Sequence, residues 1–307
     1  MKIIVLGSAA GGGFPQWNCN CRNCDGCRKG KVRAFPRTQS SIAVSGNGID
    51  WLLINASPDI LAQIRATPAL QPNRAARDTG IAAVLLMDAQ IDHVTGLLML
   101  REGRPLALHC TAPVWDELNR ALPLAPVLSH YCGVNWRPLS VDEHSEAIAL
   151  DIPGFADIRM LPIALSSKAP PYSLHRTAPQ PGDNIGLLIE DRTSGKKAFY
   201  APGLGRIEPH VEAALRKSDC VLVDGTFWTE DELIRCGFSA KTAADMGHLP
   251  ISGPGGMLAC LDALEAKTKV LIHINNTNPI LDEDSEQRSI LTRHGVQVAF
   301  DGMEIAL

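Results

Sequence analysis

Short runs of apolar residues recur along the chain, separated by glycine, proline and polar clusters. Such runs, rich in Ile, Val and Leu and bounded by turn-forming residues, predict buried strands. We expect strands at Lys2–Gly7, Ser41–Val44, Trp51–Asn55, Ile81–Met87, Leu106–His109, Ile158–Ile163, Ile185–Glu190, Lys197–Ala201, Cys220–Val223, Val270–Ile274 and Val296–Phe300.

Helices are expected between several of these strands. One begins at Ser57-Pro58-Asp59, where an N-capping residue precedes a proline at the first helical position. The other helices are expected at Val94–Arg101, Ala112–Leu122, Pro209–Lys217, Gly256–Ala266 and Glu283–His294. This mixture predicts an α/β (α+β) protein, with one large mixed sheet or a pair of sheets covered by helices.

Two long stretches interrupt the alternation. Gly7 to Arg37 is rich in Gly, Cys and Arg, and 166–184 is rich in proline. Long ordered loops in compact domains are typically binding loops or lids. In the second loop, Tyr172, His175 and Arg176 are therefore candidates for contact with a ligand. A surface excursion without a binding role is the alternative.

Composition narrows the class of protein. The chain has 307 residues, 45% of them hydrophobic, and a formal net charge of −4, which argues against nucleic acid or an anionic membrane as the main partner. Its apolar runs fall far short of the ~20 residues that span a bilayer. The N-terminal run Ile3–Leu6 is shorter than the ~7–15 residues of a secretory signal core, so we expect a cytoplasmic protein. Because no repeat or linker divides the sequence, we expect a single domain over residues 1–307.

Four cysteines form the strongest local signal. Cys19, Cys21, Cys24 and Cys27 follow a C-x-C-x2-C-x2-C pattern, and four thiolates can bind one tetrahedral Zn²⁺ at ~2.3 Å. With four sulfur ligands the site is closed, so the zinc is expected to be structural and to brace the loop at about 14–37. An iron–sulfur cluster, disulfides and free thiols are the alternatives. Disulfides are disfavoured by the short spacing and by a reducing compartment.

Several polar residues stand where predicted strands end. Asp88, Asp92 and His93 follow one strand, Asp224 follows another, and His273 lies at the end of a third. In open α/β sheets the binding site lies beyond the carboxyl ends of the strands. Two imidazoles and one carboxylate from Asp92, His93 and His273 suit a single divalent metal with open positions, including non-haem Fe(II). Zn²⁺ suits the same set almost as well.

Two further motifs are weaker. His248 stands in an expected turn and is either an acid/base or substrate contact or a structural histidine. The segment Gly7–Gly13 imitates a dinucleotide-binding loop, but it does not match G-x-G-x-x-G, and cysteines rather than a helix follow it. Nucleotide binding is therefore not expected.

Longer motifs carry a family resemblance. Asp88–His93 resembles the H-x-H-x-D-H motif of the metallo-β-lactamase fold with its first two histidines replaced, and the surroundings of His273 resemble the last histidine motif of that superfamily. Phe300–Ile305 resembles its C-terminal strand turn. Along nearly the whole chain, Gly7–Cys19, Asp88–His93 and His273–Pro279 are similar to the hallmarks of the coenzyme PQQ synthesis protein B family. The resemblance implies a metallo-β-lactamase-like four-layer αββα sandwich with two mixed β-sheets.

Departures from the superfamily argue against hydrolysis. By this resemblance, Asp88, Gln90 and Ser166 replace the histidines that hold the first metal of a hydrolase, and Pro202 replaces the bridging aspartate. A two-metal clamp is therefore not expected. The cysteine loop is also similar to the zinc-braced loop of a related cyclic phosphodiesterase family, in which a histidine completes the zinc site. That position is Asn276 here, so the resemblance implies Cys27 as the fourth ligand.

The family resemblance implies a step in the synthesis of pyrroloquinoline quinone (PQQ). The precursor is a peptide whose glutamate and tyrosine side chains become joined, and the implied reaction is Fe(II)- and O₂-dependent hydroxylation of the tyrosine ring. Asp92, His93 and His273 would hold the iron. A soluble carrier of PQQ or its precursor toward the periplasm, and a metal-dependent hydrolase of the same fold, are the alternatives. Other PQQ biosynthesis proteins are possible partners.

The remaining candidates take supporting roles in this interpretation. Asp88 and Asp224 would orient ligands or bind through water. His248 would move protons from the phenol. The 166–184 loop would cover the substrate, with Arg176 as a partner for its carboxylates.

Overall fold

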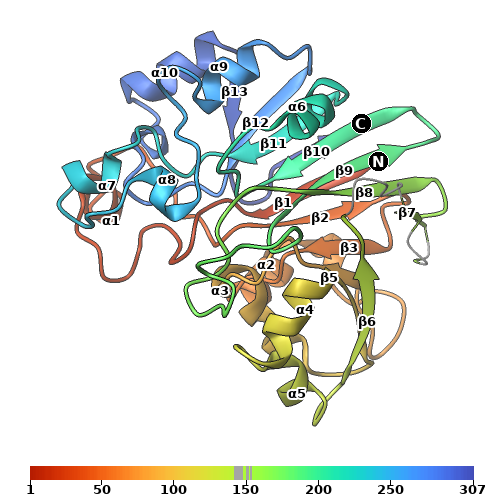
Figure 1. Ribbon diagram of the computed structural model, residues 1–307. Helices are drawn as coiled ribbons and strands as arrows, with labels where there is room; N and C mark the ends of the chain where they lie inside the picture. The colour runs from red at the N-terminus through yellow and green to blue at the C-terminus, as the bar shows by residue number, and fades with distance from the viewer. Residues whose placement is uncertain (142–147, 150–151, 153) are drawn as a thin grey trace.

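The computed structural model describes residues 1–141, 148–149, 152 and 154–307. In this part of the chain, two seven-stranded mixed sheets form the centre of the molecule (Figure 1). The first sheet has the order β14-β1-β2-β3-β4-β5-β6, from Glu304–Ala306, Lys2–Gly7, Ser41–Ser45, Trp51–Ile54, Ile81–Leu85, Leu106–Thr111 and Val134–Leu139. The second has the order β13-β12-β11-β10-β9-β8-β7, from Val296–Val298, Thr268–Ile272, Cys220–Asp224, Lys196–Ala201, Ile185–Asp191, Ile158–Ala164 and Ile148–Ala149.

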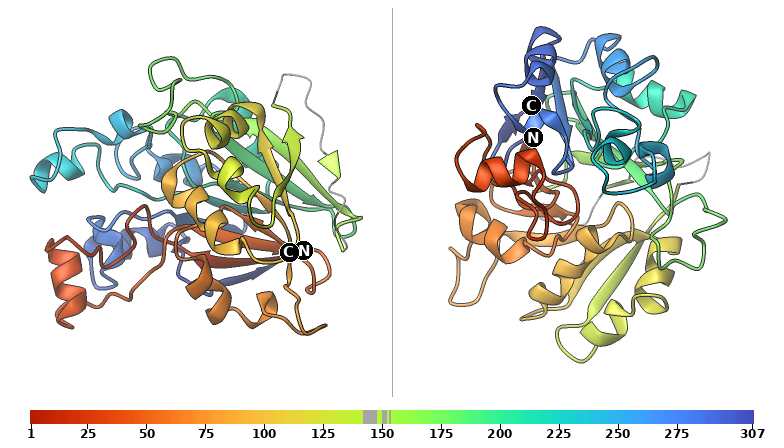
Figure 2. Two further views of the ribbon diagram at one scale, coloured as in Figure 1. Left: turned by 90° about the horizontal axis from the view of Figure 1, so that it is seen from below. Right: turned by 90° about the vertical axis from the view of Figure 1, so that its left-hand side faces the viewer.

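Helices cover the outer face of each sheet. The first sheet carries α2 (Ile60–Ala66), α4 (Ala112–Asn119) and α5 (Leu124–Leu128). The second carries α6 (Pro209–Arg216), α9 (Met257–Asp262) and α10 (Glu286–Arg293). In the right-hand view of Figure 2 the two groups lie on opposite sides of the strands. The expected four-layer αββα sandwich is therefore confirmed.

The alternation of side chains along each strand builds three apolar clusters. In β1, Ile3 and Val5 face the other sheet, whereas Ile4 and Leu6 face the helices. Because successive side chains of a strand point to opposite faces, one fully apolar strand contributes to two clusters. This burial on both faces explains why the central strands appear in the sequence as continuous apolar runs.

Each strand expected from an apolar run is present, but three strands were missed. β6 is the clearest case, since five of its six residues are partly or fully exposed and it contains Pro138. It lies at the edge of its sheet, where a strand needs little apolar surface. β14 and β7 are edge strands as well.

Several helix boundaries also differ from expectation. The helix expected at Val94–Arg101 is divided into α3 (Ile91–Val94) and the 3₁₀ helix Thr95–Leu100. The last helix, α10, begins after Ser285, whose side chain caps it by accepting a hydrogen bond from Arg288 N at 3.1 Å. The stretch from Gly7 to Arg37 is not wholly irregular, because it contains α1 (Arg22–Arg28). The short helices α7 (Glu232–Arg235) and α8 (Ala243–Met246) were not expected.

One end of the sandwich collects the polar residues that follow the strands. The segments after β4, β11 and β12 meet there, because all three strands lie in the parallel parts of their sheets. α1, α3, α7 and α8 lie at the same end (Figure 1). Within the described residues, no helix combines the length and apolar character needed to cross a membrane.

Candidate metal centre

Asp92, His93 and His273 come together at this end of the sandwich. One ligand atom from each side chain lies within 4.8 Å of the others. Asp92 Oδ2 is 3.2 Å from His273 Nε2 and 3.8 Å from His93 Nε2. Gly11 lies against this carboxylate, since a Cβ atom there would lie 3.3 Å from Asp92 Oδ2. The glycine-rich segment after β1 therefore lets the backbone approach the cluster.

The backbone at His273 is unusual. The residue directly follows β12 and has a φ of 60°, which places it in the left-handed region that non-glycine residues rarely adopt. Strained backbone of this kind is found mainly where surrounding contacts hold a residue for function. Here the turn directs the imidazole toward Asp92 rather than along the strand.

Asp88 orients the imidazole ring of His93. The Nδ1 atom of His93 lies 2.8 and 2.9 Å from the two carboxylate oxygens of Asp88. The other ring nitrogen, Nε2, is buried and has no hydrogen-bond partner among the described residues. A buried nitrogen without a partner is costly unless a ligand satisfies it. This atom, the adjacent carboxylate and His273 Nε2 are nitrogen and oxygen donors that fit a divalent metal ion.

Charge interactions shape the acid–base properties of the cluster. Burial by itself would lower the pKa of His93, but the carboxylates of Asp88 and Asp92 outweigh it and raise that pKa. Burial would raise the pKa of Asp92, but the two imidazoles outweigh it and hold that pKa well below its usual range. Asp92 is therefore ionised, and a proton on His93 can be exchanged for a metal ion.

A second carboxylate–histidine pair adjoins the first cluster. Asp224 is fully buried, and its Oδ2 lies 2.7 Å from Nδ1 of His248 and accepts a hydrogen bond from Leu204 N at 2.8 Å. Burial would raise the pKa of Asp224, but His248 outweighs it and lowers that pKa. The rings of His248 and His273 are stacked, with centroids 5.4 Å apart. His248 therefore adjoins the metal-ligand candidates without belonging to the Asp92 group.

Sequence reasoning missed Thr226. Its hydroxyl lies 2.6 Å from Asp224 Oδ1, 2.9 Å from His273 Nδ1 and 3.1 Å from His248 Nδ1. The only sequence signal was its place two residues after the strand-ending Asp224. A threonine in a turn is too common a feature to be singled out without knowing which side chains surround it.

The expected substrate loop contacts the site at one residue. The Tyr172 hydroxyl donates a hydrogen bond to the carbonyl of Ala89, next to Asp88. His175 Nδ1 pairs with Gln180 within the loop, and Arg176 donates to Ala169 O. Among the described contacts, neither His175 nor Arg176 therefore reaches the Asp92 group.

The positions of the missing superfamily histidines have other roles. Gln90 is the N-terminal cap residue of α3, and its side chain reaches Lys168 O at 3.4 Å. Ser166 donates a hydrogen bond to Glu208 at 2.9 Å. Asp88 orients His93, as described above. Among the described residues, the other group with histidine and carboxylate side chains is Asp224, His248 and His273, which shares His273 with the Asp92 group.

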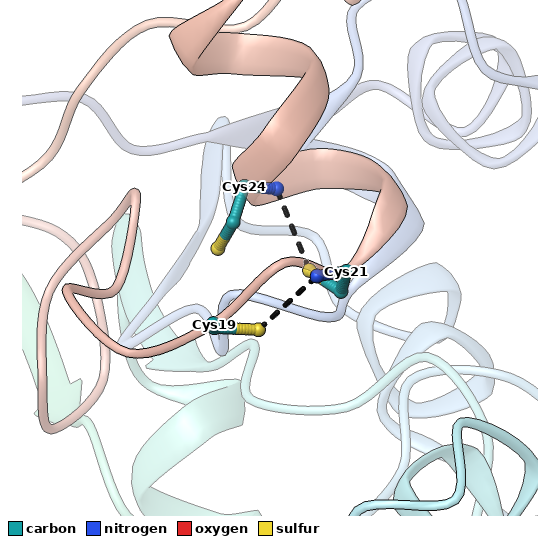
Figure 3. A group of neighbouring side chains, drawn as sticks. All are labelled: Cys19, Cys21 and Cys24. Atoms are coloured by element: carbon teal, nitrogen blue, oxygen red, sulfur yellow. Dashed lines mark hydrogen bonds between the residues drawn. The ribbon is translucent and has the colours of Figure 1, made fainter.

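The cysteine loop forms a separate cluster (Figure 3). The sulfurs of Cys19, Cys21 and Cys24 lie within 4.8 Å of one another. Backbone amides support them, since Cys21 N donates to the Cys19 sulfur and Cys24 N donates to the Cys21 sulfur, each at 3.4 Å. Asn276 Nδ2 lies 3.1, 3.7 and 3.4 Å from the sulfurs of Cys19, Cys21 and Cys24.

Cys27 differs from the expected arrangement. Its sulfur is not part of the group formed by the other three, and it donates instead to Ala34 O at 3.5 Å. Its place beside the three sulfurs is taken by the Asn276 amide, which contacts all of them. The structure thus groups three of the four cysteines expected from their spacing, with the Asn276 amide beside them.

The segment from His273 to Asn278 connects the two clusters. Asn23 of α1 donates hydrogen bonds to Asn276 O at 3.1 Å and to Asn278 O at 2.9 Å. Asn278 in turn donates to Gly225 O at 2.9 Å, next to Thr226. The cysteine loop therefore braces the same short segment that carries His273.

Glu232 of α7 supports this segment from the other side. Its carboxylate accepts hydrogen bonds from Thr277 Oγ1 at 2.5 Å and from Trp228 N at 2.7 Å. Burial nevertheless dominates and raises the pKa of Glu232 from 4.5 to about 7. The folded protein thus favours the protonated acid, and this contribution to stability is lost as the pH rises through about 7.

We expect Glu232→Gln to reduce the pH dependence of stability. Between pH 5 and pH 8 the free energy of unfolding should fall by ~2 kcal/mol less in the variant than in the wild type. Urea unfolding at the two pH values measures this difference. Glu265→Gln, at an exposed position, is the control and should behave as the wild type does. An equal fall in the Glu232→Gln variant and the wild type would contradict the prediction.

Comparison with known proteins identifies the family to which the chain belongs. Two mixed sheets between helix layers, with aspartates and histidines where the strands end, define a protein of the β-lactamase superfamily, and the family model described as "Beta-lactamase superfamily domain" matches residues 50–274. Proteins named coenzyme PQQ synthesis protein B are 65% identical in Cupriavidus taiwanensis, over 99% of both chains, and 61% identical in an Azoarcus species, over 100% of both. The chain belongs to the coenzyme PQQ synthesis protein B family.

Solved structures agree with this assignment. The crystal structure of Zn²⁺-bound PqqB from Methylobacterium extorquens is 37% identical over 100% of both chains, with a TM-score of 0.90. A diphosphatase of the PhnP family, at 18% identity and a TM-score of 0.69 over 100% of this chain and 97% of the other, shares the fold alone. The family resemblance and the fold expected from the sequence are thus both confirmed.

Proposed function

We propose that the chain acts in the biosynthesis of PQQ, as an iron-dependent hydroxylase of the tyrosine ring in a peptide-derived precursor. Asp92, His93 and His273 hold the metal. The observation that carries this proposal is the buried Nε2 of His93, which has no hydrogen-bond partner in the described part of the chain and lies beside Asp92 and His273 Nε2. Two imidazoles and one carboxylate leave coordination positions open, as in non-haem Fe(II) oxygenases. Membership of the family supports the pathway.

The reaction requires a reductant. In each hydroxylation one atom of O₂ enters the ring and replaces hydrogen, and the other atom leaves as water. Two electrons and two protons must be supplied, and we assign the electrons to an external small-molecule reductant. Bound Fe(II) would supply the activation of O₂ that a protein side chain cannot provide.

The chain's own residues orient the ligands and move protons. Asp88 fixes His93 through Nδ1, so that Nε2 is the nitrogen available to the metal. Asp224 holds His248 in the same way, and His248 exchanges a proton with the phenol of the substrate. Tyr172 ties the 166–184 loop to the turn beside Asp88, and the loop covers the precursor. Arg176 pairs with the carboxylates of the precursor after leaving its contact with Ala169 O.

The cysteine cluster is a structural zinc site in this proposal. Cys19, Cys21 and Cys24 supply three ligands, and Cys27 is the fourth after its sulfur turns from Ala34 O. Such a site keeps its thiolates reduced most readily in the cytoplasm, where we place the reaction. Binding of zinc there replaces the apolar core that the loop lacks.

A reconstitution experiment tests the reaction. Protein loaded anaerobically with Fe(II) is mixed with a tyrosine-containing precursor peptide, a reductant and O₂, and the peptide is analysed by mass spectrometry. We expect a gain of one oxygen per hydroxylation, with the label recovered from ¹⁸O₂ and not from labelled water. Tight binding of PQQ without oxygen gain would favour a carrier. Cleavage of the peptide with the label taken from water would favour a hydrolase.

Metal content separates the same candidates. We expect two metal ions per chain, one in the cysteine cluster and one at Asp92, His93 and His273, whereas a two-metal hydrolase would take up three. Elemental analysis of protein reconstituted with zinc measures this number. The Asp92→Asn variant should lose one ion, and the exposed Asp284→Asn variant should lose none. Three ions in the wild type would contradict the proposal. Zinc can fill both sites, so zinc content alone does not identify the ion that supports catalysis.

A further inference from the structure

The hydroxyl of Thr226 lies at the centre of a ring of polar atoms. Asp224 Oδ1, His273 Nδ1, His273 O and His248 Nδ1 surround it at 2.6, 2.9, 2.9 and 3.1 Å. Asp224, His248 and His273 by themselves have the composition of a metal site, and their ligand atoms lie within 4.8 Å of one another. The hydroxyl, however, lies among those atoms at hydrogen-bond distances, so this group is a hydrogen-bond network and not a second metal site.

A hydroxyl has one proton to donate, and the distances indicate where it goes. Asp224 is fully buried, and its two oxygens also accept hydrogen bonds from Leu204 N at 2.8 Å and Thr226 N at 2.9 Å, so the carboxylate acts as an acceptor. Two acceptors lie near this proton, Asp224 Oδ1 at 2.6 Å and His273 O at 2.9 Å, and the shorter distance is typical of a hydroxyl donating to a carboxylate. The nitrogens of His248 and His273 that face Thr226 must then approach lone pairs of its oxygen, and not its proton.

The proton positions on both histidines follow from this count. His248 Nδ1 is closer to Asp224 Oδ2, at 2.7 Å, than to Thr226, so its proton is donated to the carboxylate. His273 Nδ1 has no carboxylate within reach among its described contacts, and at 2.9 Å it donates its proton to Thr226 Oγ1. With its proton on Nδ1, His273 binds a metal through Nε2, the atom that lies 3.2 Å from Asp92 Oδ2.

We propose that Thr226 is a positioning residue for the metal site: it holds the proton of His273 on Nδ1, so that Nε2, which faces Asp92 and His93, is the nitrogen that binds the metal. This inference rests on the metal site of the proposed function. Histidine ligands of metals usually donate their other ring nitrogen directly to a carboxylate or carbonyl. Here the hydroxyl of Thr226 links His273 to Asp224, so one buried carboxylate orients two histidines, one directly and one through threonine.

Removing the hydroxyl should therefore weaken metal binding. In Thr226→Val the shape is kept, but His273 Nδ1 loses its acceptor in a buried site. The ring must then bury an unpaired N–H group or move its proton to Nε2, which cannot bind a metal while protonated. We expect Thr226→Val to bind Co²⁺ roughly 10–100-fold more weakly than the wild type, as for other residues that orient metal ligands. Thr226→Ser, which keeps the hydroxyl, should bind close to the wild-type level.

Cobalt titration of protein with zinc in the cysteine cluster measures this affinity through the visible absorption of the bound ion. Cobalt that entered the cysteine cluster would add sulfur-to-metal charge-transfer bands and is recognised in this way. Thr292→Val is the matched control, because its exposed hydroxyl donates only to Arg288 O on α10. Wild-type affinity in Thr226→Val, or equal losses in the Ser and Val variants, would overturn the proposal.

A measurement on the wild type tests the proton position without any variant. Long-range ¹H–¹⁵N spectra of protein labelled in histidine distinguish a protonated Nδ1 from one that carries a lone pair. We expect a protonated Nδ1 on His273, both without added metal and with zinc bound. An unprotonated Nδ1 would overturn the proposal even if the Val variant failed to fold. Failure of the wild type to bind cobalt would instead refute the proposed metal site, while the spectra would still test the role of Thr226.

Discussion

Replacing His273 with alanine is expected to abolish both metal binding at Asp92 and hydroxylation of the precursor. The substitution removes one of the three proposed ligands, so that only His93 Nε2 and the carboxylate of Asp92 remain to bind the ion. Loss of a ligand should exceed the roughly 10–100-fold loss of affinity that follows removal of a residue orienting a ligand. We therefore expect no bound ion at this site after dialysis, and no oxygen gain in the peptide.

His93→Ala should have the same effect, while both variants keep the zinc of the cysteine cluster. Elemental analysis and mass spectrometry of the peptide measure the two outcomes on the same preparations. His294→Ala is the control, since this exposed histidine pairs with Asp262 on the outer surface. If both site variants kept full metal content and full hydroxylation, the assignment of the ligands would be wrong.

Replacing Cys24 with serine is expected to remove the structural zinc and to disturb the active site as well. Cys24 is fully buried, and its sulfur lies 3.4 Å from Asn276 Nδ2. Asn276 is three residues beyond His273, within the segment that Asn23 of the cysteine loop also holds. Because binding of structural zinc contributes to folding free energy, we expect the free energy of unfolding to fall by a few kcal/mol.

The same variant should bind Co²⁺ at Asp92, His93 and His273 more weakly than the wild type does. Zinc content, urea unfolding and cobalt titration measure the three effects in turn. Cys260→Ser is the control, because Cys260 lies on α9 beside Glu212 and Arg216 and does not belong to the cysteine cluster. If Cys24→Ser lost zinc and stability but bound cobalt normally, the cysteine loop would brace the fold without positioning His273.

The buried strands could be predicted because their physical signal is local. Ile3 to Leu6 is apolar throughout because two layers pack on β1, and the run is visible without any knowledge of the partners. β6 could not be predicted in this way, since an edge strand is held by backbone hydrogen bonds to β5, which depend little on its side chains. The same limit applies to the short edge strand β14.

The metal-ligand candidates were predictable for a related reason. Asp92, His93 and His273 carry side chains that bind metals, and each follows a strand whose apolar pattern is clear. The rule that strand ends meet at one edge of a sheet then brings them together. Their supports were harder to assign. Asp88 could be proposed as an orienting residue from its position in the sequence. That both of its carboxylate oxygens contact Nδ1 of His93, however, depends on the side-chain rotamer and on packing.

The fold class, the family and the chemical types of the ligands could be predicted from the amino-acid sequence alone, because they depend on composition, local pattern and motif. The tertiary structure decided which atoms meet. Asp92 and His273 are 181 residues apart, and only the packing of two sheets brings them to 3.2 Å. It also placed Asn276 instead of Cys27 beside the three sulfurs, and Thr226 among Asp224, His248 and His273. Hydrogen bonds act over a few ångströms and depend on direction, so the spacing of these residues in the sequence could not show which atoms would form them.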